Sequence, residues 1–236
     1  MILVGRVAAL LLCIIGFPFH LLLCVLIAIA DGGAPLYRCL RLGRHGSCFE
    51  LLKYRSMKIA APHLLSSGLK MIVQDADVRV TPLGRWLRIG IDELPQLLNI
   101  IKGEMAWIGP RPDPDWMLPH YGPICRRRLS ALPGITGLAQ VLGSRHLPAA
   151  EGFALDLWYL AHRTIWLDTW IVLATPFFIG GWRSFGRSRL RHIRKLEEFN
   201  ELCRICEQEI ISAKEILLAS TDLSSVLPPN TVICQV

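Results

Sequence analysis

The feature that most constrains the fold is an uncharged apolar stretch close to the N-terminus. From Val7 to Ala30 the chain runs for about 24 residues without a formal charge. A helix rises 1.5 Å per residue, so a helix of this length can cross a hydrocarbon core of about 30 Å. We therefore expect this segment to enter a lipid bilayer.

Three arrangements of this segment are possible: a cleaved signal peptide, a straight transmembrane helix and a re-entrant hairpin. The apolar region is long for a signal peptide, and Ala30-Asp31-Gly32 is a weak cleavage site. A straight helix conflicts with Pro18, because its ring removes one helical hydrogen bond and clashes with the preceding turn. We expect a sharp bend at Pro18 and favour the re-entrant hairpin over a true span.

The charges that flank the segment agree with this preference. Arg6 precedes the stretch, and Arg38, Arg41 and Arg44 follow it. Because positive charge lies at both ends, the positive-inside rule assigns no crossing direction. Both ends can therefore face the cytoplasm, and His20 near the bend is tolerated if it reaches a polar layer or faces protein.

Composition limits the chain to one ordinary domain with a short extension. The 236 residues are 52% apolar and 19% charged, and the net charge of +7 favours an anionic partner. Phospholipid headgroups, a pyrophosphate-bearing substrate and nucleic acid all fit that charge. The eight cysteines have no regular spacing, which indicates a reducing, cytoplasmic compartment, and we interpret the lone Cys203-x-x-Cys206 pair as an ordinary helical pair.

The remaining patterns predict an α+β fold that is mainly α. A short strand or hairpin is expected between Pro35 and Tyr54, and a basic amphipathic helix over Leu83 to Arg88. Past Gly181 an arginine-rich run leads into a helical pattern from Lys195 to Leu218, and the tail after Ser220 is expected to be loose. We divide the chain into a membrane segment (1–36), a compact catalytic domain at the membrane interface (37–181) and a basic, helical extension (182–236).

The run with the clearest chemical content is Ile91-Asp-Glu-Leu-Pro-Gln-Leu-Leu-Asn-Ile-Ile101. Its apolar residues have helical spacing, which predicts a helix that begins near Asp92. Asp is a favoured N-cap residue, and Pro95 is harmless in a first turn. Free amides and the helix dipole could hold phosphate beside Asp92 and Glu93. The alternative is that the two acids only cap the helix.

Cationic and turn residues around this run favour the phosphate interpretation. Arg88 lies one turn upstream, and Arg111 stands between Pro110 and Pro112, whose fixed φ angles stiffen the backbone. A guanidinium offers a planar fork that matches two phosphate oxygens. Thr136 adds a hydroxyl in the tight turn from Pro133 to Gly137.

In order and spacing these stretches resemble the bacterial sugar transferases, also called monotopic polyprenyl-phosphate phosphoglycosyl transferases. The resemblance covers roughly Pro18 to Pro176. It rests on Lys53-Tyr-Arg-Ser-Met57, Asp77-Val-Arg-Val-Thr81, Leu83-Gly-Arg-Trp-Leu-Arg88, Asp92-Glu-Leu-Pro-Gln96, Lys102-Gly-Glu-Met105, Gly109-Pro-Arg-Pro112, Pro133-Gly-Ile-Thr-Gly-Leu-Ala-Gln140, Asp156-Leu-Trp-Tyr159 and Trp166-Leu-Asp168.

The resemblance implies a re-entrant helix broken at Pro18, a catalytic pair of Asp92 and Glu93 that binds Mg²⁺, and a ping-pong reaction. Asp92 would attack the phosphorus that bears the sugar of a UDP-sugar, UMP would leave, and a polyprenyl (undecaprenyl) phosphate would then accept the phosphosugar. Glu93 would bind the metal or manage a proton. Arg88, Arg111, Thr136 and Arg145 are our candidates for binding substrate phosphate.

The implied setting is the cytoplasmic face of a bacterial inner membrane, in exopolysaccharide or lipopolysaccharide biosynthesis. The acceptor keeps its phosphate at the interface, so the active site must sit at that height. Residues 165–180, with Trp166 and Trp170, are expected to form a second interfacial element. Membrane lipid is therefore an expected partner, and homo-oligomerisation is left open.

This chain departs from the family pattern at several positions. Phe17 stands where a serine commonly precedes the hairpin proline, so the bend depends on Pro18. The run Arg38-Cys-Leu-Arg-Leu-Gly43 lacks one polar and one acidic group, and Arg145 comes one place late after Val141-Leu-Gly-Ser144. A downstream family arginine falls on Gly152. These differences bear on substrate contacts, and the sequence does not identify the sugar.

The sequence leaves two alternative functions to consider. In the first, the chain is a non-catalytic membrane scaffold of a polysaccharide assembly system, and the acidic pair only caps its helix. In the second, the arginine-rich run near Arg187 binds nucleic acid. That run has no aromatic platform or reading helix, so a basic patch at a membrane surface explains it more simply. We expect no nucleic-acid partner.

Overall fold

The computed structural model describes residues 2–59, 61, 63–66, 77–143, 147–180, 186–219 and 231–234. Helices dominate, and the strands form three small two-stranded sheets, which confirms the mainly helical class with a β-hairpin. In chain order the elements are α1 (Ile2–Asp31), β1 (Leu36–Leu42), η1 (Arg44–Gly46), β2 (Cys48–Tyr54), β3 (His63–Ser66), α2 (Pro82–Leu87), η2 (Ile91–Glu93), α3 (Gln96–Lys102), β4 (Ala106–Ile108), η3 (Asp115–His120), α4 (Pro123–Arg126), η4 (Arg127–Ser130), β5 (Gly134–Thr136), α5 (Leu138–Val141), α6 (Ala149–Ala161), α7 (Ile165–Ile179), α8 (Arg187–Ile193), α9 (Glu197–Ala219) and β6 (Thr231–Cys234).

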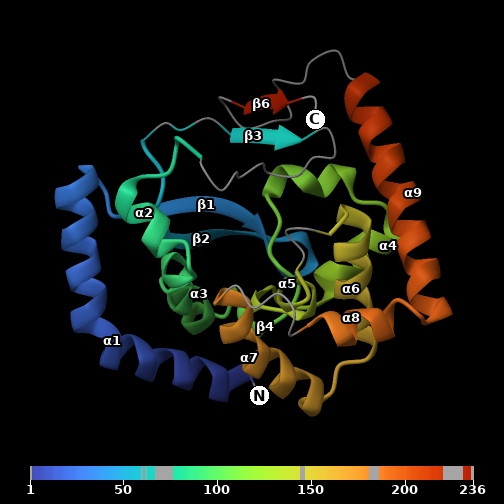
Figure 1. The fold of residues 1–236 in the computed structure, drawn as a ribbon, viewed down its shortest axis with the longest axis horizontal. Helices are drawn as coiled ribbons and strands as arrows, with labels where there is room; N and C mark the ends of the chain where they lie inside the picture. Colours follow the sequence, from blue (N-terminus) through green and yellow to red (C-terminus); the bar gives the residue numbers. More distant parts are fainter. Residues whose placement is uncertain are drawn as a thin grey trace.

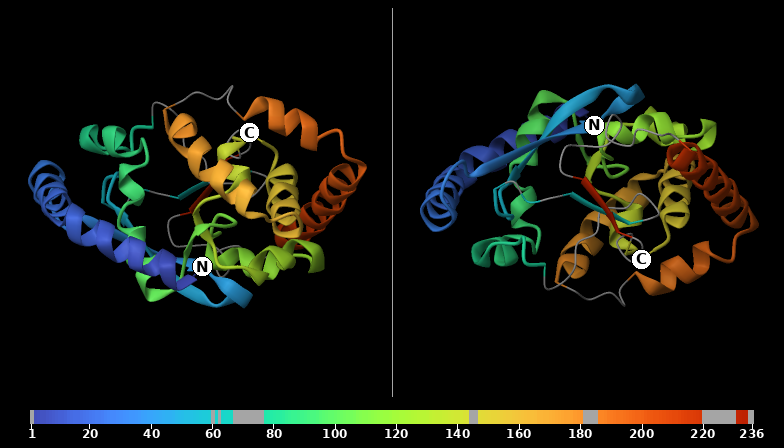
Figure 2. Two further views of the ribbon diagram at one scale, coloured as in Figure 1. Left: turned by 90° about the horizontal axis from the view of Figure 1, so that it is seen from below. Right: turned by 90° about the horizontal axis from the view of Figure 1, so that it is seen from above.

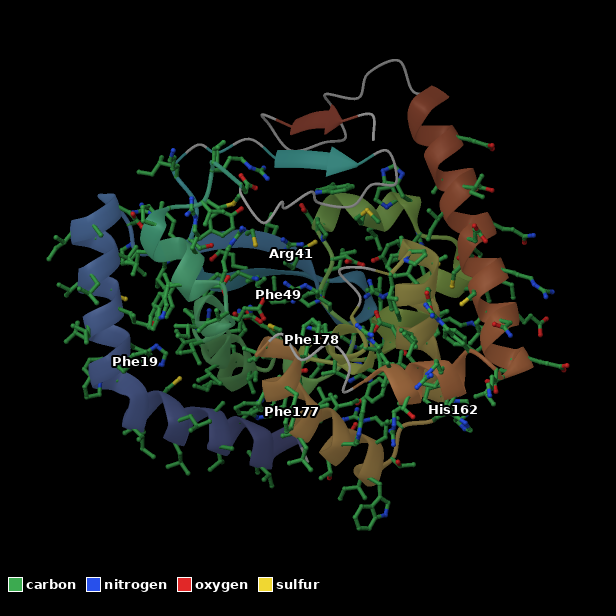
Figure 3. The ribbon with its side chains drawn as sticks, in the orientation of Figure 1. Phe19, Arg41, Phe49, His162, Phe177 and Phe178 are labelled. Carbon is green, nitrogen blue, oxygen red and sulfur yellow. The ribbon has the colours of Figure 1, made fainter. Side chains whose placement is uncertain are left out.

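The apolar N-terminal segment forms the single long helix α1, which contains Pro18. Figure 1 shows the helix turning sharply about halfway along, and Figure 3 places Phe19, the neighbour of Pro18, at the corner. Proline has no N–H to donate to the preceding turn, which accounts for a bend at this position. By length and composition α1 could cross a membrane, and only 11% of its most apolar window is buried.

Both arms of α1 pack against the rest of the protein. On the first arm, Ala9 is fully buried in a cluster with Leu97 and Ile100 of α3. On the second arm, Leu23 and Ile27 pack against Tyr54 and Leu87. Polar contacts accompany both: Trp107 Nε1 donates to the Gly5 carbonyl at 2.9 Å, and His20 Nδ1 lies 2.5 Å from Tyr54 Oη. The remaining apolar side chains of α1 are largely exposed.

Strands β1 and β2 form the expected hairpin, an antiparallel pair in which Leu36 faces Tyr54 and Leu42 faces Cys48. Helix α3 packs across it. Asn99 of α3 is fully buried and connects the two elements: its Oδ1 accepts from the Leu52 amide at 3.1 Å, and its Nδ2 donates to the Glu50 carbonyl at 2.7 Å. The same Nδ2 donates to Glu104 at 2.7 Å.

The largest core lies where α5, α6, α7, α8 and α9 meet, on the opposite side of the hairpin from the second arm of α1 (Figure 1). Leu155 and Ile171 are fully buried there. The same cluster includes Leu190 of α8 and Phe199 of α9. The hydrophobic core therefore continues through the C-terminal extension, and α9 confirms the helix expected from Lys195 to Leu218.

The expectation of a loose tail was wrong at four residues. Thr231–Cys234 form β6, which pairs in parallel with β3, so that His63 faces Thr231. The segment reads Thr-Val-Ile-Cys, and β-branched residues favour a strand when an edge is free to pair. The basic stretch from Leu83 to Arg88 was predicted correctly, as α2 and its C-cap.

We predict that Asn99→Ala destabilises the protein by about 2 kcal/mol or more, since it leaves a buried amide and a partly buried carbonyl without their partner. For a chain of this size, that lowers the melting temperature by about 5 °C or more. Thermal unfolding in detergent measures the shift. The matched control is Asn200→Ala on α9, an exposed asparagine that donates to the Arg194 carbonyl. Equal melting temperatures for the two variants would contradict the role given to Asn99.

Candidate active site

Asp92 and Glu93 lie in the 3₁₀ turn η2, between α2 and α3. The expectation that Asp92 caps a helix was wrong. Gly90 occupies the cap position of the turn with a left-handed φ of 117°, and α3 begins only at Gln96 with Pro95 as its cap. Because Pro95 has no N–H to donate to Ile91, the α-helical ladder starts after it. No side-chain hydrogen bond caps the start of this turn.

The Glu93 carboxylate is held by two cations from distant parts of the chain. Lys53 Nζ of β2 lies 2.7 Å from Glu93 Oε1, and Arg111 Nη2, from the loop after β4, donates to the same oxygen at 3.0 Å. The Lys53 and Glu93 side chains are mostly buried, and that of Arg111 is 41% exposed. Burial raises the pKa of Glu93, but Arg111 and Lys53 outweigh it and hold the pKa far below its usual range. Glu93 is therefore ionised at neutral pH.

Asp92 has a different environment. Within the described part of the chain, no group makes a hydrogen bond or ion pair to its carboxylate. Burial raises the pKa of Asp92, and the neighbouring charge of Glu93 raises it further. Lys53, Arg111 and Arg88 lower this pKa, but the net shift is upward. The turn thus holds one acid fixed by cations and one available to another molecule.

Arg88 is the C-cap residue of α2, and its Nε donates to Ser56 Oγ at 3.3 Å. The helix approaches Ser56 closely: a Cβ on Gly84 would lie 2.1 Å from the Ser56 carbonyl oxygen. Only glycine permits this approach. The Leu83-Gly-Arg stretch therefore brings Arg88 close enough to lower the pKa of Asp92.

The loop that carries Arg111 is fixed from behind by Arg128, whose side chain is only 3% exposed. Its guanidinium donates to the Arg111 carbonyl at 3.0 Å and to Asp156 Oδ2 at 2.5 Å, and it forms an ion pair with Asp113. It also lies 4.6 Å from the centre of the Phe153 ring. Sequence reasoning missed Arg128, because in the run Arg126-Arg127-Arg128 it looks like part of a solvated basic surface.

The remaining candidates for binding substrate phosphate are Thr136 and Arg145. Thr136 is buried on β5, and its hydroxyl lies 2.8 Å from that of Thr175 on α7. Thr175 in turn donates to the Ile171 carbonyl, so Thr136 is the donor of the pair. Arg145 lies outside the described residues. The structure thus brings together Asp92, Glu93, Lys53, Arg88 and Arg111, which we call the acid–cation cluster. In the sequence, Lys53 stands out only as part of a stretch that resembles the family.

The carboxylates of this cluster are suited to bind a metal ion only together with a bound substrate. Among the described residues, no three or more Asp, Glu, His or Cys side chains gather as a complete metal site. Mg²⁺ needs fewer, because it is commonly bound by one or two carboxylates together with substrate phosphates and water. Asp92 and the Glu93 oxygen that faces neither cation fit that requirement.

Apolar surface lies next to the cluster. Helix α7 exposes Trp166 by 81% and Leu173 by 62%, and its last turn reaches Gly90, where a Cβ would meet Ile179 at 3.2 Å. The view from below in Figure 2 shows α7 and α1 on the same side of the protein. Figure 3 labels Arg41 and Phe49, which face each other across the hairpin, and also Phe177 and Phe178 of α7.

Comparisons with known proteins identify the family of this chain. Residues 2–180 match the family model described as bacterial sugar transferase. The galactosyl transferase CpsE of Streptococcus agalactiae is 36% identical over 69% of this chain and 40% of its own length. The undecaprenyl-phosphate galactose phosphotransferase of Salmonella typhimurium is 36% identical over 61% of this chain and 33% of its length. The UDP-glucose:undecaprenyl-phosphate glucose-1-phosphate transferase of Caulobacter vibrioides is 38% identical over 72% of this chain and 65% of its own length. The chain thus spans only a third to two fifths of the first two relatives.

We predict that Glu93→Gln lowers stability at neutral pH, because it leaves Lys53 and Arg111 without their counter-ion. The folded pKa of Glu93 lies below its ordinary value of 4.5, so its contribution is present above that pH and is lost as pH falls towards the folded pKa. The difference in unfolding free energy between wild type and variant should be constant near neutrality and shrink below about pH 4.5. Thermal unfolding across pH measures it.

The matched control is Glu50→Gln, since Glu50 lies 3.6 Å from Arg38 in an exposed pair. Exposed pairs contribute little, so this variant should resemble the wild type at every pH. A Glu93→Gln difference that persists undiminished in acid would show that the carboxylate charge is not what stabilises the turn.

Proposed function

The chain belongs to the bacterial sugar transferase family, and from this premise we propose that it transfers a sugar-1-phosphate from a UDP-sugar to undecaprenyl phosphate. The names of its relatives support this reaction, since two of them state an undecaprenyl-phosphate acceptor and one states a UDP-glucose donor. The product would be the first lipid-linked intermediate of a polysaccharide. The reaction would take place at the cytoplasmic face of the inner membrane.

The observation that carries the proposal is the contrast between the two acids. The Glu93 carboxylate is fixed by Lys53 and Arg111, whereas that of Asp92 has no hydrogen-bond partner among the described groups and is surrounded by cations. A nucleophilic carboxylate must be free to reach the phosphorus, and its neighbours must offset the charge of a diphosphate. Asp92 meets the first requirement, and Lys53, Arg88 and Arg111 meet the second.

The two steps follow from this arrangement. An Asp92 oxygen attacks the phosphorus that carries the sugar, the bond to the bridging oxygen breaks, and UMP leaves with the electron pair. An oxygen of undecaprenyl phosphate then attacks the same phosphorus and releases the Asp92 carboxylate. Arg111 is suited to grip the phosphate oxygens, because its backbone carbonyl is held by Arg128 while its guanidinium is partly exposed. Mg²⁺, held by Asp92 and Glu93, would supply further neutralisation of phosphate charge.

Glu93 is poorly suited to manage a proton. A general base works best when its pKa is near the working pH, and that of Glu93 is held far below it. Its two hydrogen bonds instead suit an electrostatic role. It keeps Lys53 and Arg111 in place around Asp92, and one of its oxygens stays available to a metal.

The apolar surfaces support a site at the membrane interface. Helix α1 is long and apolar, bends at Pro18 and exposes most of its side chains, which suits a re-entrant hairpin. Helix α7 presents a second exposed apolar face, and its end contacts Gly90, two residues before Asp92. An acceptor whose phosphate stays at headgroup height could then reach Asp92.

A purified-enzyme assay tests the proposal. The full chain is incubated with undecaprenyl phosphate, Mg²⁺ and a panel of UDP-sugars, and UMP release is measured. We expect release with at least one sugar, and a loss of at least ~10³-fold in Asp92→Asn. Mass spectrometry of the quenched enzyme should find a phosphosugar on the peptide that contains Asp92. The control Asp115→Asn, in η3, should retain wild-type activity. No release with any sugar would favour the scaffold function, whereas an active Asp92→Asn variant would contradict the assignment of Asp92 as the nucleophile.

The acid limb of the activity gives an independent check. Lys53 lowers the pKa of Asp92, so Lys53→Met raises that pKa, and Asp92 then needs a higher pH to ionise. We expect the acid limb of kcat/KM for UMP release to move to higher pH in Lys53→Met. The exposed Lys58→Met should leave it in place. A variant whose rate falls equally at every pH would contradict the assignment of that limb to Asp92.

A further inference from the structure

A basic surface follows the part of the chain that matches the family model. That match ends at residue 180, and α8 begins at Arg187. Between Gly186 and Leu196 the sequence holds five cations and no carboxylate: Arg187, Arg189, Arg191, Arg194 and Lys195. We call these five residues the α8 cations. None of the reaction steps proposed above uses them.

Helix α8 is firmly seated in the protein. Leu190 and Ile193 are buried in the largest core, and Gly186 packs so closely that a Cβ there would lie 3.0 Å from the Val141 carbonyl. Burial of two branched side chains fixes the face that a short helix presents. The exposed side chains of Arg187 and Arg191 project from the rest of the helix surface, and Lys195 is exposed just after the helix ends.

Some of the α8 cations have partners within the protein, and some do not. Arg194 forms an exposed ion pair with Glu151, at 2.6 Å between Nε and Oε1. Arg189 lies 4.1 Å above the Trp170 ring of α7. Arg187 and Arg191 make no ion pair with any carboxylate in the described part of the chain. Their charges are available to an external anion.

The contact between Arg189 and Trp170 fixes where these charges lie. Trp166, Trp170, Leu173 and Phe177 follow one another at spacings of four, three and four residues, so they line one side of α7. Trp166 and Leu173 belong to the exposed apolar face of that helix. Arg189 stacks on the same row, so α8 borders the apolar face, and the view from below in Figure 2 shows α7 between α1 and α8.

We propose that the exposed face of α8 binds the headgroups of anionic phospholipids. Aromatic and aliphatic side chains on α7 reach into the bilayer, and the neighbouring cations meet phosphate at its surface, as in amphipathic interfacial elements. Each cation near an anionic surface strengthens binding about 5-fold. The lipid contact orients the protein about the axis set by α1. It does not depend on the proposed catalysis, and UMP release is not a measure of it.

Hydrogen exchange of the full chain in lipid nanodiscs tests this. One set of discs contains only phosphatidylcholine, and the other adds phosphatidylglycerol. We expect peptides from 186–196 to exchange about 5-fold or more slowly in the anionic discs, and 1 M salt to abolish the difference. In Arg187→Gln/Arg191→Gln the two discs should give equal rates. A control with two exposed cations elsewhere, Arg127→Gln/Arg204→Gln, should behave as wild type.

Other outcomes would overturn the proposal. Equal exchange of wild-type α8 in both discs would show that its cations do not contact the headgroups. Protection of α8 by a DNA oligonucleotide in phosphatidylcholine discs, without protection by phosphatidylglycerol, would assign the surface to nucleic acid. Both substituted arginines are exposed, so unchanged exchange of α9 verifies that the variant is folded.

Discussion

The arrangement of the candidate active site depends on the Glu93 carboxylate and the two cations that it holds. Lys53 comes from β2, Glu93 from the turn before α3, and Arg111 from the loop after β4. These segments are far apart in sequence and meet at one carboxylate oxygen. A partly buried charge is costly unless it is paired, so each of the three groups requires the other two. The position of Asp92 follows from this, since it precedes Glu93 in the same turn.

The apolar helix α1 and the domain that carries the acid–cation cluster form one structural unit. Ala9 on the first arm of α1 and Ile27 on the second are fully buried against α3, β2 and α2. The same three elements hold or flank the acid–cation cluster. Because α1 bends at Pro18, its two arms can pack against two sides of the elements that hold the acid–cation cluster.

The sequence predicted what depends on local patterns. Helical spacing identified α2 and α9, turn residues identified the hairpin, and ordered short motifs brought Asp92, Glu93, Arg88 and Arg111 into one site. It failed where long-range contacts decide. The start of α3 was misplaced, since Pro95 could stand equally well in a first turn or before it. The roles of Lys53 and Arg128 depend on partners 40 and 28 residues away. The pairing of β6 with β3 spans most of the chain.

The packing of α1 has a consequence for how the protein is made. Ala9 leaves the ribosome about 90 residues before its core neighbours Leu97, Ile100 and Met105. At ~5 to 20 residues per second, the apolar helix must wait roughly 5 to 20 s for the surface on which it will rest. Bilayer insertion during translation would shield it over that interval. Lipid would then first cover this apolar helix during synthesis, and would later surround the site of the proposed reaction.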